Sequence, residues 1–454
     1  MNPTELRAVV ALALVYALRM LGLFMILPVF VLLGGDLQYA TPALIGLALG
    51  AYGLSQAVLQ IPYGLLSDRF GRKPLIYAGL VIFAGGSVLA ATSESIYGVL
   101  AGRLLQGAGA IASVLMALVS DLTREQSRTM AMAGIGLSIG LAFALSLVLG
   151  PLVSDAFGLP GIFWLTAALA LVGIVAVATL VPTPEVSRAH PDVQAAPARI
   201  GALLKVPRLL RLDFGIFSLH LVLTAAFLVV PTFLREDLDL VQESHWWVYL
   251  SVMGCAFFAM IPFIILAERK RLMKPVMVGA VSLLLLATVL LLGRWNSLAM
   301  VWAVLFLFFV AFNLLEASLP SLVSKEAPAA SRGTAMGIYS TSQFLGAFTG
   351  GAVGGLLLSG WGSAGVLTLM VVALLIWLAV VCTMQPPSYS TSYVVKLKRF
   401  GADQLADVRD ALAQITGVED VVILAEADQA FLKVDRKRLD NAALTQSPYV
   451  ISIQ

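Results

Sequence analysis

The sequence is poor in charged residues, cysteines and histidines. Of its 454 residues 12% are charged, whereas a soluble domain has about 25%. The only cysteines, Cys255 and Cys382, lie inside apolar runs, so the sequence offers no disulfide framework and no thiolate metal motif. With three histidines there is no zinc-binding spacing, and neither a nucleotide loop nor a nucleophile–base arrangement is present. We therefore expect no metal, no cofactor and no enzymatic activity, and the net charge of +3 gives no reason to expect nucleic-acid binding.

Apolar residues make up 59% of the chain, too many for a water-soluble globule. A membrane-spanning helix needs about 20 mostly apolar residues. On that scale the sequence predicts twelve spans, at 8–33, 42–66, 74–93, 96–120, 130–154, 160–182, 212–234, 246–267, 275–293, 297–323, 334–358 and 363–384. The predicted fold class is thus an all-α polytopic membrane protein embedded in a lipid bilayer.

Lysine and arginine gather in alternate connections between these spans. The basic connections include 69–73, 124–128, 188–211, 269–274 and 325–332, whereas the opposite connections carry only Arg235 and Arg294. Because basic loops stay in the cytoplasm, we expect these connections on the cytoplasmic side. An even number of spans then places both termini there as well.

The long connection at 183–211 divides the spans six and six, and the two sets are copies. Residues 118–132 read LVSDLTREQSRTMAM, and residues 322–336 read LVSKEAPAASRGTAM, which align without a gap. Lys73-Pro74 likewise matches Lys274-Pro275. Paired repeats are typical of secondary carriers, whose substrate site lies at midplane between the repeats.

One loop between spans, GLLSDRFGRKP at 64–74, is unusually dense in glycine and charge. It resembles the signature loop of the major facilitator superfamily, and Arg103-Leu-Leu-Gln-Gly resembles that family's fourth-helix arginine segment. The fifth span is similar to the glycine motif of the drug–proton antiporter branch, with Ser154-Asp155 where the usual pattern has glycines; its matching residues are Gly134, Gly136, Gly140, Gly150 and Pro151. The resemblance covers residues 5–385 and implies a bacterial inner-membrane transporter.

We interpret the signature loop as a conformational latch between the two halves. Gly64 and Gly71 allow a close approach and a turn, Asp68 can face the positive end of another helix, and Arg72 can pair with Asp121. The start of the eleventh span, with Gly333 and Gly337, is the expected partner. The alternative is that these are ordinary positive-inside charges around a turn.

Ionisable groups inside spans are costly and tend to face a cavity or a partner. The candidates for the substrate and proton pathway are Arg19, Arg103, His220, Asn313 and Glu316, on spans that the resemblance places around the central cavity. Glu316 is the candidate for proton coupling, because burial favours the neutral carboxyl. It could instead form a permanent ion pair with Arg19 or Arg103, and His220 could be a packing group.

The composition changes after residue 392. Strand-like and helix-like segments follow in the order βαββαβ, which predicts a ferredoxin-like α+β domain. Without a Cys-x-x-Cys in its first strand–helix loop, this domain is not a thiolate metal carrier. Its small size favours docking on the transporter or pairing with another copy.

The expected function is secondary active transport by alternating access, with proton-coupled efflux of a small molecule. The alternatives are a uniporter or symporter of a small solute, and a membrane receptor that signals through the C-terminal domain. The expected domains are a six-helix bundle at 1–182, a cytoplasmic linker at 183–211, a second bundle at 212–385, a linker at 386–392 and the ferredoxin-like domain at 393–454.

Overall fold

The computed structural model describes residues 1–182, 197–293, 295–328, 331–386, 391–398, 404–424, 429–434 and 438–453. Parts of both predicted linkers, 183–196 and 387–390, lie outside these residues. The helices before the longer gap are α1 (Pro3–Phe24), α2 (Phe30–Leu33), α3 (Pro42–Phe70), α4 (Arg72–Ala91), α5 (Ile96–Ala108), α6 (Ala112–Leu122) and α7 (Glu125–Thr179), with the 3₁₀ turn η1 (Gly34–Asp36). After it come α8 (Pro197–Leu203), α9 (Pro207–Glu236), η2 (Gln242–Ser244), α10 (His245–Arg269), α11 (Met273–Leu291), α12 (Leu298–Glu326) and α13 (Arg332–Cys382).

Ten helices in the described ranges are long and apolar enough to cross a membrane. Two of them, α7 and α13, are each broken by one glycine with a positive φ, at Gly158 (65°) and Gly362 (63°). Glycine adopts this backbone conformation without a Cβ penalty. Both breaks fall where the sequence separates two predicted spans, so the mostly helical membrane fold is confirmed, with ten or twelve crossings according to how the broken helices are counted.

Two predicted spans differ from the observed helices. The first was expected to continue to residue 33, but α1 ends at Phe24 and Pro28 lies in the following turn. Proline has no N–H to donate and its ring clashes with the carbonyl four residues earlier, which ends the helix. The fourth span is divided into α5 and α6, and the residues between them, 109–111, are not helical.

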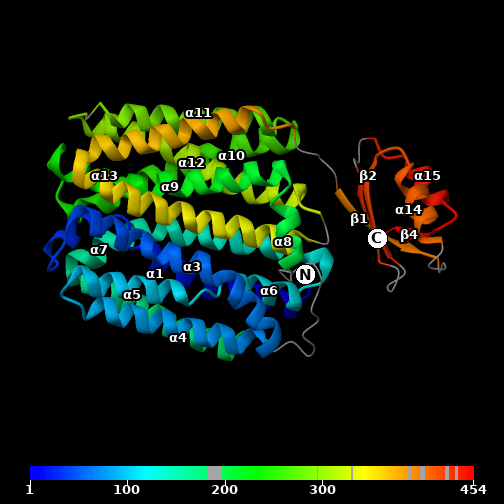
Figure 1. Cartoon of the computed structure of the whole chain (residues 1–454), viewed down its shortest axis with the longest axis horizontal. Coiled ribbons are helices and arrows are strands. Elements are labelled where there is room, and N and C mark those ends of the chain that lie inside the picture. The colour runs from blue at the N-terminus through cyan, green and yellow to red at the C-terminus, as the bar shows by residue number, and fades with distance from the viewer. Residues whose placement is uncertain are drawn as a thin grey trace.

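The helices α1–α7, called the first half below, lie together in Figure 1, and α9–α13, the second half, lie beside them. The chain begins at one end of this bundle, called the loop end because the 64–74 loop lies there. The turns at Gly158 and Gly362 lie at the opposite, far end, because α7 and α13 start at the loop end and each crosses the bundle once before its glycine and once after it. Large buried hydrophobic clusters fill both halves.

A small four-stranded sheet lies beyond the loop end in Figure 1. Its elements are β1 (Thr391–Leu397), α14 (Leu405–Ala413), β2 (Val418–Leu424), β3 (Gln429–Val434), α15 (Asn441–Gln446) and β4 (Val450–Ile453). The strands are antiparallel in the order β2-β3-β1-β4. Buried residues such as Val395, Val408 and Leu432 give this unit its own hydrophobic core.

Candidate functional site

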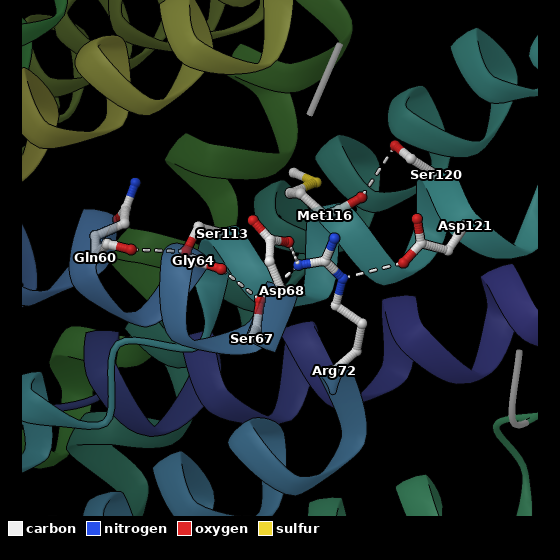
Figure 2. Close-up of polar contacts among 9 residues, drawn as sticks. All are labelled: Gln60, Gly64, Ser67, Asp68, Arg72, Ser113, Met116, Ser120 and Asp121. Carbon is white, nitrogen blue, oxygen red and sulfur yellow. Dashed lines mark hydrogen bonds and ion pairs between the residues drawn. The ribbon is translucent and has the colours of Figure 1, made fainter. Parts of the chain in front are cut away.

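The loop at the end of α3 is organised around the guanidinium of Arg72. Gly71, with a φ of 91°, ends α3 and turns the chain so that Arg72 begins α4. The Nε of Arg72 lies 3.0 Å from Oδ2 of Asp121, and its Nη1 pairs with Asp68. The same nitrogen donates to the Ser67 hydroxyl at 2.6 Å (Figure 2). The side chains of Arg72 and Asp121 are 3% and 2% exposed, so this cation and its partner are almost fully removed from water.

The expected pairing of Arg72 with Asp121 is therefore confirmed. Among the residues that the structure describes, the expected approach of the eleventh span to Gly64 is not observed. A Cβ added to Gly64 would meet only Ser113 of α6, at 3.5 Å, and one added to Gly337 of α13 would meet nothing within 4 Å. At the loop end, Asp68 turns toward Arg72 of its own half, and the start of α13 stands apart from Gly64.

The two halves meet closely at the far end. A Cβ on Gly50 of α3 would lie 2.7 Å from the carbonyl oxygen of Phe348 in α13. Gly46 and Gly53 approach the α13 backbone just as closely. A further contact between the halves joins α7 to η2, where the Gln242 amide donates to the Ser154 hydroxyl at 3.1 Å. The structure is thus joined across its halves at the far end and separated at Gly64 and Gly337.

Arg19, on α1, lies inside the first half with 1% of its surface exposed. Its Nη2 donates to the Gln56 side chain and to the Gly109 carbonyl, which lies at the break between α5 and α6 and also accepts from the Ile111 N–H. Its guanidinium carbon lies 5.7 Å from the Tyr52 ring centre and 5.6 Å from that of Phe83. Nε and Nη1 have no hydrogen-bond partner among the described residues.

Arg103, on α5, is 2% exposed and bonded to neutral acceptors throughout. It donates to the Ala48 carbonyl at 3.4 Å, the Leu49 carbonyl at 3.3 Å and the Gln106 side chain at 2.9 Å. Its guanidinium also lies over the ring of Tyr52. Neither Arg103 nor Arg19 has a carboxylate partner within the described ranges, so the alternative of a permanent ion pair with Glu316 is not observed.

Glu316 instead belongs to a polar cluster inside the second half. Its Oε2 lies 3.9 Å from Nδ1 of His220 on α9, and its Oε1 accepts from the Gln343 amide of α13 at 3.4 Å. The same amide nitrogen is 2.8 Å from Nε2 of His220. His220 is enclosed, whereas a third of the Glu316 side chain is exposed. The structure thus brings together two of the predicted pathway residues and adds Gln343.

Asn313 was expected beside Glu316 on one face of the tenth span. It lies one helical turn before Glu316 on α12, and its Nδ2 has no hydrogen-bond partner among the described residues. Two further polar residues, Tyr339 of α13 and Asp213 of α9, are buried in this half and were not singled out. Polar residues inside apolar runs, such as Asp213 and Gln343, are visible in the sequence. Only the packing of α9, α12 and α13 shows which of them lie near Glu316.

Comparisons with known proteins agree with this architecture. The sequence profile of the Major Facilitator Superfamily matches residues 12–351 and, in a second overlapping match, 274–400. The chain is 46% identical over 451 residues to the "Inner membrane transport protein YajR" of Escherichia coli K12, covering 98% of each chain. It is 36% identical over 352 residues to the "Uncharacterized transporter BU466" of Buchnera aphidicola from Acyrthosiphon pisum, covering 77% of this chain and 90% of that one.

Among solved structures, the fold is similar to a bacterial homologue of the human lysosomal transporter Spinster. The TM-score is 0.68 at 14% sequence identity, and the match covers 84% of this chain and 97% of that one. The chain therefore belongs to the Major Facilitator Superfamily and is a membrane transporter of that superfamily.

Proposed function

We propose that this transporter works by alternating access and couples the efflux of a small molecule to proton entry. Its two halves, residues 1–182 and 212–385 joined by the linker 183–211, rock about a site near the midplane. The loop end faces the cytoplasm of a bacterium, with both termini on that side of the inner membrane. This orientation rests on the concentration of lysine and arginine in the loop-end connections.

The observation that carries the proton-coupling proposal is the setting of Glu316. A carboxylate in the interior of a membrane protein is costly unless it is paired or protonated. Glu316 has one oxygen without a hydrogen-bond partner among the described residues, and its only ion-pair partner there is His220 at 3.9 Å. A third of its side chain is exposed while its Oε2 is buried, so the carboxyl lies at the edge of the packed interior. Such a group can take up a proton when it faces one side and release it when it faces the other.

The latch proposal is supported by the contrast between the two ends of the bundle. With the halves joined through Gly50 and Phe348 at the far end, the structure corresponds to a carrier that opens toward the loop end. In that state Asp68 is held by Arg72. When the halves rock the other way, Asp68 would approach the start of α13, where the helix dipole favours an anion.

The test is transport by the full chain in proteoliposomes, with a panel of amphiphilic compounds, sugars and organic ions. When the lumen is made proton-rich, protons that leave through the protein should drive at least one compound into the lumen. Glu316→Gln should abolish that dependence on the gradient. Glu236→Gln, at an exposed position at the far end of α9, is the matched control and should behave as the unaltered protein. Transport that is unaffected by the gradient would instead indicate a uniporter, and co-movement of solute and protons a symporter.

We assign the C-terminal unit to the ferredoxin-like plan; it was predicted at 393–454 after a linker at 386–392, whereas its first strand β1 begins at Thr391. The order β2-β3-β1-β4 and the succession β1-α14-β2-β3-α15-β4 support this assignment. Its role is to dock on the transporter or to pair with another copy. Comparing the molecular mass of the full chain in detergent with that of a chain ending at Gln385 distinguishes the two, because only pairing changes the number of copies.

A further inference from the structure

One carboxyl of the second half, that of Asp213 on α9, takes no part in the hydrogen bonds around Glu316. Asp213 is 8% exposed, and it forms no hydrogen bond or ion pair with any described residue. Because α9 begins at the loop end with Pro207, Asp213 lies about 9 Å along the helix from that end. A carboxylate inside a membrane-spanning helix is costly unless a cation or a proton neutralises it.

The cations near the start of α9 do not neutralise Asp213. Arg208 pairs with Glu326 of α12 at 3.5 Å. Arg211 lies two residues before Asp213 and therefore on the opposite face of the helix. No charged side chain of the described residues acts on the Asp213 carboxyl electrostatically. Within the described part of the chain, protonation is therefore what can neutralise it.

The helices that pack most extensively on α9 are α13 and α12. The cation in the last turn of α12, Lys325, binds Glu268 of α10, with its Nζ 2.6 Å from each carboxylate oxygen. Deeper in the second half, these two helices carry Glu316 and Tyr339. The described ionisable groups that they place in the interior are therefore an acid and a phenol.

The hydroxyl of Tyr339 relates Asp213 to the cluster around Glu316. Tyr339 is 3% exposed, and its hydroxyl has no hydrogen-bond partner among the described residues. Both Glu316 and Asp213 lie close enough to act on it electrostatically. Gln343 follows Tyr339 by one turn on the same face of α13, and His220 lies two turns after Asp213 on α9. Since both helices begin at the loop end, polar groups follow one another from that end toward Glu316.

The carboxyls of Glu316 and Asp213 differ in how they are enclosed. Oε2 of Glu316 is fully enclosed and has no partner, whereas neither oxygen of Asp213 is fully enclosed, although both lack a partner among the described residues. The loop end is also the end at which the halves stand apart, at Gly64 and Gly337. Asp213 is therefore the nearer of the two carboxyls to the water at the loop end.

We propose that the proton of Glu316 leaves toward the loop end through Asp213, with the Tyr339 hydroxyl as the bridge. The O–H bond of Tyr339 breaks as its proton passes to the Asp213 carboxylate, and the proton of the Glu316 carboxyl restores the hydroxyl. Asp213 then gives its proton to water at the loop end. Asp213 is a proton-transfer residue, and Glu316 remains the coupling acid. The inference rests on the proton coupling proposed above and adds an exit path to it.

The test is the rate at which Glu316 loses its proton, measured by rapid-mixing infrared spectroscopy of the full chain in nanodiscs. The probe is the proton itself, so no transported solute is needed. The carboxyl band that Glu316→Gln removes reports on Glu316, and the band that Asp213→Asn removes reports on Asp213. When the pH is raised, Asp213→Asn should slow the loss of the Glu316 band about tenfold or more. A positioned acid–base group contributes about 10²–10⁴-fold to a proton transfer, and water replaces part of that contribution.

Tyr339→Phe should slow the same step, because it removes the bridging hydroxyl and keeps the ring. Asp213→Glu keeps a carboxyl and should recover most of the rate. Asp155→Asn, at an exposed position of α7 near the far end, is the matched control and should leave the rate unchanged. The pH at which half of the Glu316 band is lost should move little in these variants, whereas a change in packing alone would move that pH and leave the rate intact.

An unaltered rate of proton loss from Glu316 in either Asp213→Asn or Tyr339→Phe would overturn the exit path and leave proton coupling at Glu316 standing. The exit path also fails if no carboxyl band belongs to Asp213 at any pH, because Asp213 then never carries a proton. If Glu316 itself neither gains nor loses a proton, the proposed proton coupling fails together with this inference.

Discussion

The two ion pairs at the loop end show how a repeated architecture can keep a contact while changing its energetics. Arg72 and Asp121 are almost fully buried, whereas Glu268 and Lys325 are partly exposed. Both members of the first pair stand at the unfavourable end of their helix, Arg72 at the start of α4 and Asp121 at the end of α6. The ion pair therefore offsets the unfavourable interaction of each charge with its helix dipole. In the second pair only Glu268 opposes its helix dipole, since Lys325 lies in the last turn of α12.

The interiors of the two halves differ in the same way. The first half holds Arg19 and Arg103 among neutral acceptors and aromatic rings, fully enclosed. The second half holds Glu316 with His220 and Gln343, and a third of the Glu316 side chain is exposed; polar atoms without a hydrogen-bond partner among the described residues occur in both halves, at Arg19 and at Glu316. A closed network favours one geometry, and an open one permits protonation and rearrangement. We therefore expect the interior of the first half to keep one arrangement during the transport cycle, and the polar cluster of the second half to change its protonation and its contacts.

The largest expected effect follows from removing one member of the buried pair. Asp121→Asn removes one of the two carboxylates of the buried Arg72 guanidinium; because Asp68 still pairs with Arg72, we expect a loss of about 3 kcal/mol of folding free energy, the lower end of the range for a broken buried pair. Lys325→Met, at the aligned position of the second half, should cost only about 0–1 kcal/mol because that pair is exposed to water. Thermal and denaturant unfolding of the detergent-solubilised protein measure both. Equal losses would show that the two pairs are energetically alike.

A smaller loss is expected in the closed network of the first half. Gln106→Leu removes the acceptor of Arg103 and the donor to the Ser87 hydroxyl, at 2.9 and 2.8 Å. Leaving a buried cationic donor unpaired costs about 1.5–3 kcal/mol. The conservative variant Gln106→Glu keeps an acceptor for Arg103 and should recover part of the loss in the same unfolding measurement. A Gln106→Glu variant less stable than Gln106→Leu would argue against hydrogen bonding as the cause.

Much of this fold could be predicted from the sequence because its spans are long and their ends are marked. The breaks at Gly158 and Gly362 coincide with short polar or glycine-containing gaps between apolar runs. The pairing of Arg72 with Asp121 could be predicted because both charges flank spans at the same end. The break after Gly109 could not, because it is stabilised by Arg19, a residue of another helix 90 positions away.

The partner of Glu316 was equally out of reach of the sequence. Its neighbour Gln343 lies on α13, and which face of that helix meets α12 depends on the packing of three helices. The apolar pattern of α13 gives little orientation, since its residues are hydrophobic on nearly all sides. The alignment of the two repeats pairs Lys325 with Asp121. The acid that binds Lys325 is Glu268, which lies one position before the residue that aligns with Asp68.

The contact between the halves at the far end can be broken by a single added side chain. Gly50→Val places carbon atoms against the Phe348 carbonyl, which a Cβ alone would approach to 2.7 Å. Overpacking of this kind costs typically about 1–3 kcal/mol, and here the protein can escape it by separating α3 from α13. We expect the far end to become more accessible to a membrane-impermeant thiol reagent at Phe157→Cys. Gly85→Val, where a Cβ would meet nothing within 4 Å, is the matched control and should leave the labelling rate unchanged.

The smallest effect on stability should come from the open cluster of the second half. Gln343→Leu removes the amide that reaches His220 at 2.8 Å and Glu316 at 3.4 Å. Since Glu316 is a third exposed, water can replace the lost donor, and the expected loss is about 1 kcal/mol or less. The effect on transport should exceed the effect on stability, because Gln343 is the neutral group that orients both His220 and Glu316. A change in the gradient dependence of transport with little change in the free energy of unfolding would assign Gln343 a role in proton coupling. A loss of stability as large as that of Gln106→Leu would mean that the polar cluster of the second half is as tightly packed and hydrogen-bonded as that of the first.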